Sequence, residues 1–321
     1  MVRSLLSIMI ILSALCSTAF PQELKYTMKT IGTHDDEVLS VFVNGNDDMF
    51  ASCSLDETVK VWSLPDGKLL KTFVGHLGQV NSVSFSGNDK LIATGSSDQT
   101  VRIWSVETGK QISVLRGHTD QVMGVYFSQD DSSSFLASAS PDKTIKLWDV
   151  RYETEIKTLR DHTMPVNNVA YSYDGKYLAS CSDDKTVKIW SSDYSTKEPI
   201  MTLLGHDAPV LTCLFNFSST RLASSDEKGN IFIWEIPSGK LLRKIKAHSN
   251  IVQDLSFKYD DEKIIVSASL DGKVKMWNSE SGDNMMTFDV GVDIWSIDLV
   301  SDASILILGC ADGTVRFLTK E

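Results

Sequence analysis

The segment GHLGQVNSVSFSGNDKLIATGSSDQTVRIW, residues 75–104, decides the fold of this chain. A histidine, His76, stands near its start, and a tryptophan, Trp104, ends it. Between them, short runs rich in valine, isoleucine, threonine and phenylalanine are separated by turns rich in glycine, asparagine and aspartate. Runs of this length and composition, bounded by turn residues, predict short antiparallel strands.

The same pattern is repeated along the chain, and no stretch shows a convincing apolar period of 3.6 residues. All six histidines lie in one register, and six of the seven tryptophans follow them by 28 to 30 residues. A second turn after each tryptophan leads to a further apolar run, such as KLLKTFV at 68–74. Each unit therefore predicts one four-stranded antiparallel sheet. The repeated residues are His34, His76, His118, His162, His206 and His248, with Trp62, Trp104, Trp148, Trp190, Trp234 and Trp277.

These repeats resemble the WD40 family, on the Gly-His pairs that end at His76, His118 and His206 and on the one Trp-Asp pair, Trp148-Asp149. The resemblance covers about residues 24–321 as a single domain. It implies an all-β, seven-bladed β-propeller in which each unit is one four-stranded antiparallel blade.

The seventh unit, about residues 284–321, keeps the strand pattern but has lost the repeated polar residues. Val290, Leu308 and Leu318 stand where the histidine, serine and tryptophan of the other units stand. Residues 25–31, KYTMKTI, match a fourth strand that has no first three strands before it. We expect this N-terminal strand to complete the last blade, which leaves no exposed sheet edge.

A histidine, a serine or threonine, an aspartate and a tryptophan recur in five of the units and resemble the structural hydrogen-bonded network of that family. A buried tryptophan has one N–H to satisfy, and a neutral histidine can link a carboxylate to a hydroxyl. Repetition favours this role over a metal site or a catalytic triad, and it uses every histidine of the chain. In the fifth unit Lys228 occupies the aspartate position, so we expect blades five and seven to be the least stable. The expected members are His34, Ser52, Asp56 and Trp62; His76, Thr94, Asp98 and Trp104; His118, Ser138, Asp142 and Trp148; His162, Ser180, Asp184 and Trp190; His206, Ser224 and Trp234; and His248, Ser267, Asp271 and Trp277.

Charge and motifs narrow the class of function. Lysine and arginine number 31 against 42 acidic residues, and this net charge of −11 disfavours nucleic acid as a partner. We find no phosphate loop, zinc-protease motif, nucleophile elbow or dinucleotide-binding glycine motif, so we expect no catalytic residue, metal or cofactor. The resemblance implies a non-enzymatic scaffold or adaptor, a subunit of a multi-protein complex. The alternatives are an extracellular ligand-binding propeller and an enzyme on a propeller scaffold.

The resemblance also implies a top face, ringed by the histidine turns, on which a protein or peptide partner binds. The implied positions lie three and five residues after each histidine and one before each network aspartate. These 21 positions hold four acidic residues and no lysine or arginine, so we expect no preference for phosphopeptides, whose recognition needs an arginine cluster. We predict a partner with an apolar anchor next to basic residues. The residues expected to contact it are Trp295, Asp293, Leu39, Glu37, Leu55, Ile251, Leu270, Met123 and Leu211.

Trp295 falls out of phase with the other six tryptophans. It occupies the variable slot five residues after the histidine position, which is typical of an interface anchor. The alternative is that its side chain packs into the space left by the missing histidine and tryptophan of blade seven.

The N-terminus and the cysteines point to different compartments. Residues 1–19 combine a basic start, an apolar run and small residues, which is typical of a signal peptide for the secretory pathway. The five cysteines show no disulfide-framework spacing, which suits the cytosol or nucleus, as does the family resemblance. Asn216 begins one glycosylation sequon, a pattern that is common by chance.

Overall fold

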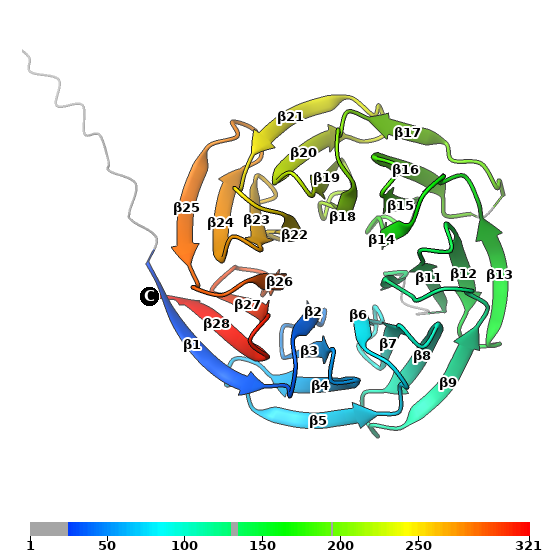
Figure 1. Ribbon diagram of the computed structural model, residues 1–321, viewed down its shortest axis with the longest axis horizontal. Helices are drawn as coiled ribbons and strands as arrows, with labels where there is room; N and C mark the ends of the chain where they lie inside the picture. Colours follow the sequence, from blue (N-terminus) through cyan, green and yellow to red (C-terminus); the bar gives the residue numbers. More distant parts are fainter. Residues whose placement is uncertain (1–24, 130–133, 194) are drawn as a thin grey trace, which may run out of the picture.

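In the computed structural model, which describes residues 25–129, 134–193 and 195–321, seven four-stranded antiparallel sheets stand in a ring (Figure 1). The described residues form strands and turns, with no helix among them. The predicted seven-bladed propeller is confirmed. The signal peptide predicted for residues 1–19 lies outside the described residues.

Each blade runs from an inner strand at the central channel to an outer strand at the rim (Figure 1). The strands are, for blade one, β2 (Val38–Val43), β3 (Met49–Ser54), β4 (Thr58–Ser63) and β5 (Leu69–Val74); for blade two, β6 (Val80–Phe85), β7 (Leu91–Ser96), β8 (Thr100–Ser105) and β9 (Gln111–Arg116); for blade three, β10 (Gly124–Phe127), β11 (Phe135–Ala139), β12 (Ile145–Asp149) and β13 (Thr154–Leu159); for blade four, β14 (Val166–Tyr171), β15 (Tyr177–Ser182), β16 (Thr186–Ser191) and β17 (Met201–Leu204); for blade five, β18 (Val210–Phe215), β19 (Arg221–Asp226), β20 (Asn230–Glu235) and β21 (Leu241–Lys246); for blade six, β22 (Val252–Phe257), β23 (Ile264–Ser269), β24 (Lys273–Asn278) and β25 (Asn284–Asp289); and for blade seven, β26 (Ile294–Leu299), β27 (Ile305–Cys310), β28 (Thr314–Lys320) and β1 (Tyr26–Thr33).

The first strand of the described chain closes the ring. β1 pairs antiparallel with β28, with Tyr26 opposite Lys320 and Thr33 opposite Thr314. The backbone N–H of Glu321 donates to the carbonyl of Lys25 at 3.0 Å. Blade seven therefore joins the two ends of the described chain in one sheet (Figure 1).

The core lies between neighbouring blades. Val125 and Leu136 of blade three, for example, belong to the same buried cluster as Ile103 of blade two. Each sheet is covered on both faces by its neighbours, which explains why β7, β11 and β19 are buried along nearly their whole length.

A bulge recurs at the start of the inner strands and matters for the channel. In blade one the pairing of β2 with β3 shifts between Val38 and Ser40, so Leu39 is the extra residue. A bulge leaves its extra residue outside the ladder and re-aims its side chain. The residues placed in this way are Leu39, Asn81, Asn167, Leu211, Gln253 and Trp295.

Candidate partner-binding face and its supporting network

The repeated polar residues form one hydrogen-bonded chain in each of the first six blades. In blade one Trp62 Nε1 donates to Ser52 Oγ at 2.8 Å, and Ser52 Oγ lies 2.8 Å from His34 Nε2. His34 Nδ1 lies 2.9 Å from Asp56 Oδ2. Because the serine hydroxyl already accepts from the indole, it donates to Nε2, and the proton on Nδ1 then points at the carboxylate. Equivalent tryptophan–hydroxyl–histidine–aspartate contacts recur in blades two to six.

Burial favours the neutral form of His34, His76 and His248. It lowers the pKa of His34 and His76, and it lowers the pKa of His248 to about 4, although the paired aspartates act in the opposite direction. In each of the first six blades the histidine ring joins its turn to the sheet through hydrogen bonds at both ring nitrogens. The network therefore supports the turns at the top end of the channel.

Blade five corrects the expectation for its network. Lys228 does stand at the aspartate position in the sequence, but the carboxylate is supplied by Asp226, whose Oδ2 lies 2.8 Å from His206 Nδ1. Asp226 is 0% exposed, and Asn230 Nδ2 donates to both of its oxygens at 3.0 Å. Burial alone would raise the pKa of Asp226, but the hydrogen bonds from His206 and Asn230 outweigh it and hold the pKa below its usual value. Lys228 points outward to Asp207 at 3.1 Å.

Blade seven has replaced the network by apolar packing. Val290, Leu308 and Leu318 are buried in one cluster with Ile294 and Ile297. Trp295 does not belong to this cluster, so the space left by the missing polar residues is filled by other side chains.

The bulge residues surround a cavity of about 360 Å³ at the top of the central channel. Six of the nine residues expected to contact a partner line it together: Glu37, Leu39, Leu55, Met123, Leu211 and Trp295. The other three, Asp293, Ile251 and Leu270, are exposed or partly exposed but lie outside the lining. Ile251 and Leu270 are joined by a backbone hydrogen bond of 3.1 Å in the turns of blade six.

Trp295 is half-buried, and its environment differs from that of the six network tryptophans. Its Nε1 is covered and has no hydrogen-bond partner within the part of the chain that the structure describes. Apolar contact over the ring, rather than a hydrogen bond, is therefore what this side chain offers at the cavity.

The sequence reasoning missed Asp254, which lies in the cavity wall one residue after the bulge of β22. Its carboxylate accepts from Ser296 Oγ at 2.6 Å and from the backbone N–H of Ile297 at 3.1 Å. Burial raises the pKa of Asp254 to about 7, even though the hydrogen bond from Ser296 lowers it. The sequence does contain a signal for this residue. Six residues after the histidine position the other units carry serine, glycine, asparagine or threonine, whereas this unit carries an aspartate.

The ionisable side chains that line the cavity are all acidic among the described residues. Glu37 and Asp254 are its acidic residues, and none of the described residues that line it is a lysine, arginine or histidine. The described ranges contain no group of three or more potential metal ligands, and no helix in them is suited to crossing a membrane.

The buried cysteines and Asn216 contribute no accessible group. Cys53, Cys181, Cys213 and Cys310 are free thiols inside the blades. Asn216 is 1% exposed, and its side-chain amide donates to Ser218 Oγ at 2.9 Å. In the folded blade the amide nitrogen of this sequon is therefore buried and hydrogen-bonded within its own turn.

Comparison with known proteins gives one family and several partial relatives. The profile of the family described as WD domain, G-beta repeat, matches residues 25–63, 67–105, 109–149, 153–191, 197–235 and 239–278. WD repeat and SOCS box-containing protein 1 of Homo sapiens is 39% identical over 67 residues, which are 21% of this chain and 16% of that protein. Jouberin of Mus musculus is 28% identical over 103 residues, 24% of this chain and 10% of Jouberin. Protein SPA1-RELATED 3 of Arabidopsis thaliana is 29% identical over 120 residues, 37% of this chain and 14% of that protein. The matches therefore span only a small part of each relative.

Proposed function

The chain belongs to the WD-repeat family, and on that premise we propose that it is a non-enzymatic scaffold that binds a protein or peptide partner on its top face. The observation that carries the proposal is the cavity at the top of the channel, in which bulge residues from separate blades meet. Rigid sheets hold these side chains, and the buried networks fix the turns around them. A pre-formed surface of this kind binds without first having to order itself.

The lining indicates the chemistry of the partner. Leu39, Leu55, Leu211, Met123 and Trp295 offer apolar surface, and Glu37 supplies negative charge beside it. Asp254, whose pKa burial raises to about 7, adds a second carboxyl group. An apolar anchor flanked by lysine or arginine complements this arrangement. A phosphorylated segment does not, because no cation among the described lining residues meets the phosphate.

Membership of a multi-protein complex is part of the proposal. The segment related to this chain covers only 16% of WD repeat and SOCS box-containing protein 1 and 14% of Protein SPA1-RELATED 3. We infer that this propeller likewise serves as the docking part of an assembly.

The test is a binding measurement on the full chain. A partner is captured by cross-linking, identified by mass spectrometry and then titrated in purified form against wild type and Trp295→Ala. The substitution should weaken binding by about 2 kcal/mol or more, as expected for a central aromatic anchor. Tyr152→Ala removes an aromatic side chain that is 73% exposed and outside the cavity, and it should leave the affinity unchanged. Equal affinities of wild type and a folded Trp295→Ala variant would contradict the site.

A further inference from the structure

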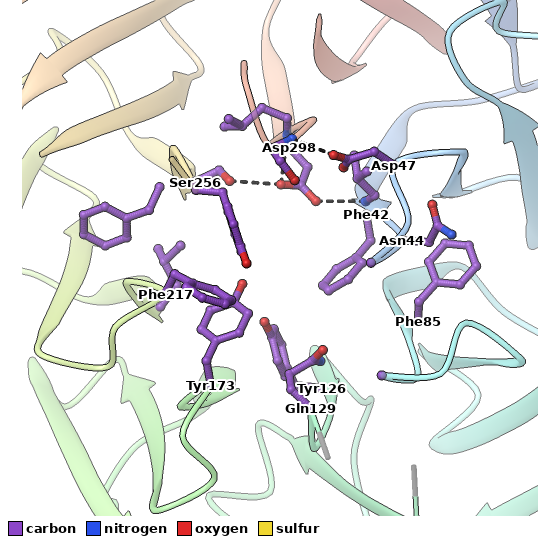
Figure 2. A pocket seen from close by; sticks show the side chains of 18 of the residues that line it. Phe42, Asn44, Asp47, Phe85, Tyr126, Gln129, Tyr173, Phe217, Ser256 and Asp298 are labelled. Carbon is purple, nitrogen blue, oxygen red and sulfur yellow. Dashed lines mark hydrogen bonds between the residues drawn. The ribbon is translucent and has the colours of Figure 1, made fainter. Parts of the chain in front are cut away.

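The opposite mouth of the channel holds a second cavity, of about 380 Å³, that the proposed function does not use (Figure 2). The inner strands enter the channel at the top face, so the turns that follow their last residues lie at the other end. The lining of this cavity comes from the ends of those strands and from these turns. It shares no residue with the top cavity.

One wall is a row of aromatic rings. Tyr173, Phe217 and Tyr259 each stand two residues after an inner strand, in three successive blades. The centroids of Tyr173 and Phe217 are 4.9 Å apart, and those of Phe217 and Tyr259 are 4.0 Å apart. The three residues are 41%, 40% and 48% exposed, so they contribute little to the core. The other four blades carry Gly45, Gly87, Gln129 and Ser301 at this position.

A second pair of rings lies deeper, on the inner strands. Phe42 of blade one and Tyr126 of blade three meet edge to face, with centroids 5.7 Å apart. Both are partly exposed to the channel, and Figure 2 shows Phe42, Tyr126, Tyr173 and Phe217 around one opening. The mouth therefore presents aromatic faces and edges from several directions.

The charge of this mouth is negative. Asp47, Asp89 and Asp298 line it, and the described lining residues include no lysine, arginine or histidine. Asp89, in the turn after β6, is committed to the neighbouring turn of blade one, since it accepts from the backbone N–H of Gly45 at 3.0 Å. Asp298 Oδ1 accepts from Ser256 Oγ and the N–H of Leu299. Among the described residues, Oδ2 accepts from the N–H of Val43 alone, at 2.8 Å. A carboxylate has about four acceptor sites, so Oδ2 retains one.

These features exclude two classes of occupant. An anion would meet three carboxylates without a compensating cation. A purely apolar side chain would cover Asp298 and take water away from its free acceptor without replacing the hydrogen bond, which is unfavourable. A cation that stacks on rings satisfies both the aromatic faces and the carboxylate.

We propose that this bottom mouth binds the guanidinium group of an arginine carried by a partner peptide, stacked on the aromatic row and donating to Asp298. Guanidinium is planar, is more weakly hydrated than an ammonium group and carries five N–H donors. It can therefore leave water at lower cost than lysine and still hydrogen-bond with its edge while its face meets a ring. The two cavities share no lining residue, so substitutions can distinguish this site from the top face.

The experiment uses the full chain and four acetylated, amidated tripeptides, Gly-X-Gly, in which X is arginine, lysine, citrulline or norleucine. Isothermal titration at low salt should give the tightest binding for arginine, by about tenfold over its neutral isostere citrulline. Citrulline or norleucine binding as tightly as arginine would overturn the proposal, as would lysine matching arginine or the absence of binding by all four.

Variants then locate the binding. Phe217→Ala removes an exposed ring and should weaken arginine binding about tenfold without unfolding the chain. Tyr152→Ala also removes an exposed aromatic side chain, but one outside the lining of the mouth, and it should leave arginine binding unchanged. Trp295→Ala should also leave it unchanged, and loss of arginine binding in that variant with retention in Phe217→Ala would place the peptide at the top cavity and refute this site. Thermal unfolding of each variant checks that the fold is retained.

Discussion

Blades five and seven both depart from the repeated sequence, but they solve the problem in different ways. Blade five keeps the buried network by taking its carboxylate from Asp226, two residues before the usual position. Blade seven abandons the network and buries Val290, Leu308 and Leu318 in its place. In blade five the position of the acidic residue has changed, but the hydrogen-bonded network survives. In blade seven the equivalent positions are still buried, but the network is absent.

Blade seven is tied to its neighbours by hydrogen bonds at the channel. The N–H of Val41 in blade one donates to Ser296 Oγ at 3.0 Å, and Ser256 Oγ in blade six donates to Asp298 Oδ1 at 2.9 Å. Asp254 of blade six accepts from Ser296 and Ile297. These contacts lie between blades, whereas the network of blade five lies within one. The comparison predicts that blade five depends on its own polar residues and that blade seven depends on packing and on its neighbours.

The largest expected effect is the loss of the displaced carboxylate. Asp226→Ala should lower the free energy of unfolding by about 3–5 kcal/mol, because it leaves His206 and Asn230 without their buried acceptor. Lys228→Ala, at the position that the sequence pattern assigns to the aspartate, should cost under about 1 kcal/mol, since its ion pair with Asp207 is on the surface. Urea unfolding measures both losses of stability. Equal losses would show that Asp226 contributes no more to stability than the surface residue Lys228.

The matching change in blade seven removes an apolar side chain. Leu308 is 0% exposed, and Leu308→Ala should cost about 3 kcal/mol through lost burial and the cavity it leaves. Lys320→Ala at the exposed end of β28 serves as the control and should be near neutral. A cost for Leu308→Ala as small as that of the control, in the same urea titration, would show that apolar packing has not replaced the network.

The channel carboxylates should give the contacts between blades a pH dependence. Burial raises the pKa of Asp254 to about 7 and that of Asp298 to about 6, against about 3.9 when unfolded. The folded state thus binds protons more tightly, and the stability from this source is present below pH of about 4 and is lost as pH rises to about 7. Asp254→Asn should remove the part of this loss of stability that comes from the titration of Asp254.

The measurement compares the free energy of unfolding of wild type with that of Asp254→Asn at each pH. A pH profile of wild type alone is not enough, because the titration of His248 changes stability in the opposite direction. Its pKa of about 4 when folded means that its contribution is lost as pH falls below about 6.5. The stability of Asp254→Asn relative to wild type should rise by about 4 kcal/mol between pH 4 and 8, since the pKa of Asp254 differs by about three units between the folded and unfolded states. A difference that is constant with pH would show that Asp254 titrates as it does in the unfolded chain.

The smallest effect concerns hydrogen exchange. With its network intact, blade five should protect the amides of β19 to within about 1 kcal/mol of those of β7, its counterpart in blade two. The earlier expectation that blade five is weak rested on Lys228, and it no longer has that basis. Markedly faster exchange in β19 than in β7 would restore it.

The fold was largely predictable because histidine and tryptophan recur at fixed spacing, and most of the top cavity followed from the same register. Asp226 was not predictable by counting, because hydrogen bonds depend on where oxygen atoms lie in space. Asn230 supports the displaced carboxylate from the next strand, which spacing alone does not show. The aromatic row was visible as Tyr173, Phe217 and Tyr259 in one phase, but only the closed ring faces them toward Phe42 and Asp298.

The pairing of β1 with β28 also has a consequence for the order of folding. β1 leaves the ribosome before any strand of the sheet it belongs to, and its partner is almost three hundred residues away along the chain, with Thr27 opposite Thr319. Contacts of such long sequence separation form slowly, because the loop between them must first be ordered. We expect the other blades to assemble while β1 waits, so that closure of the ring is the last event and the step most exposed to mispairing with a second copy.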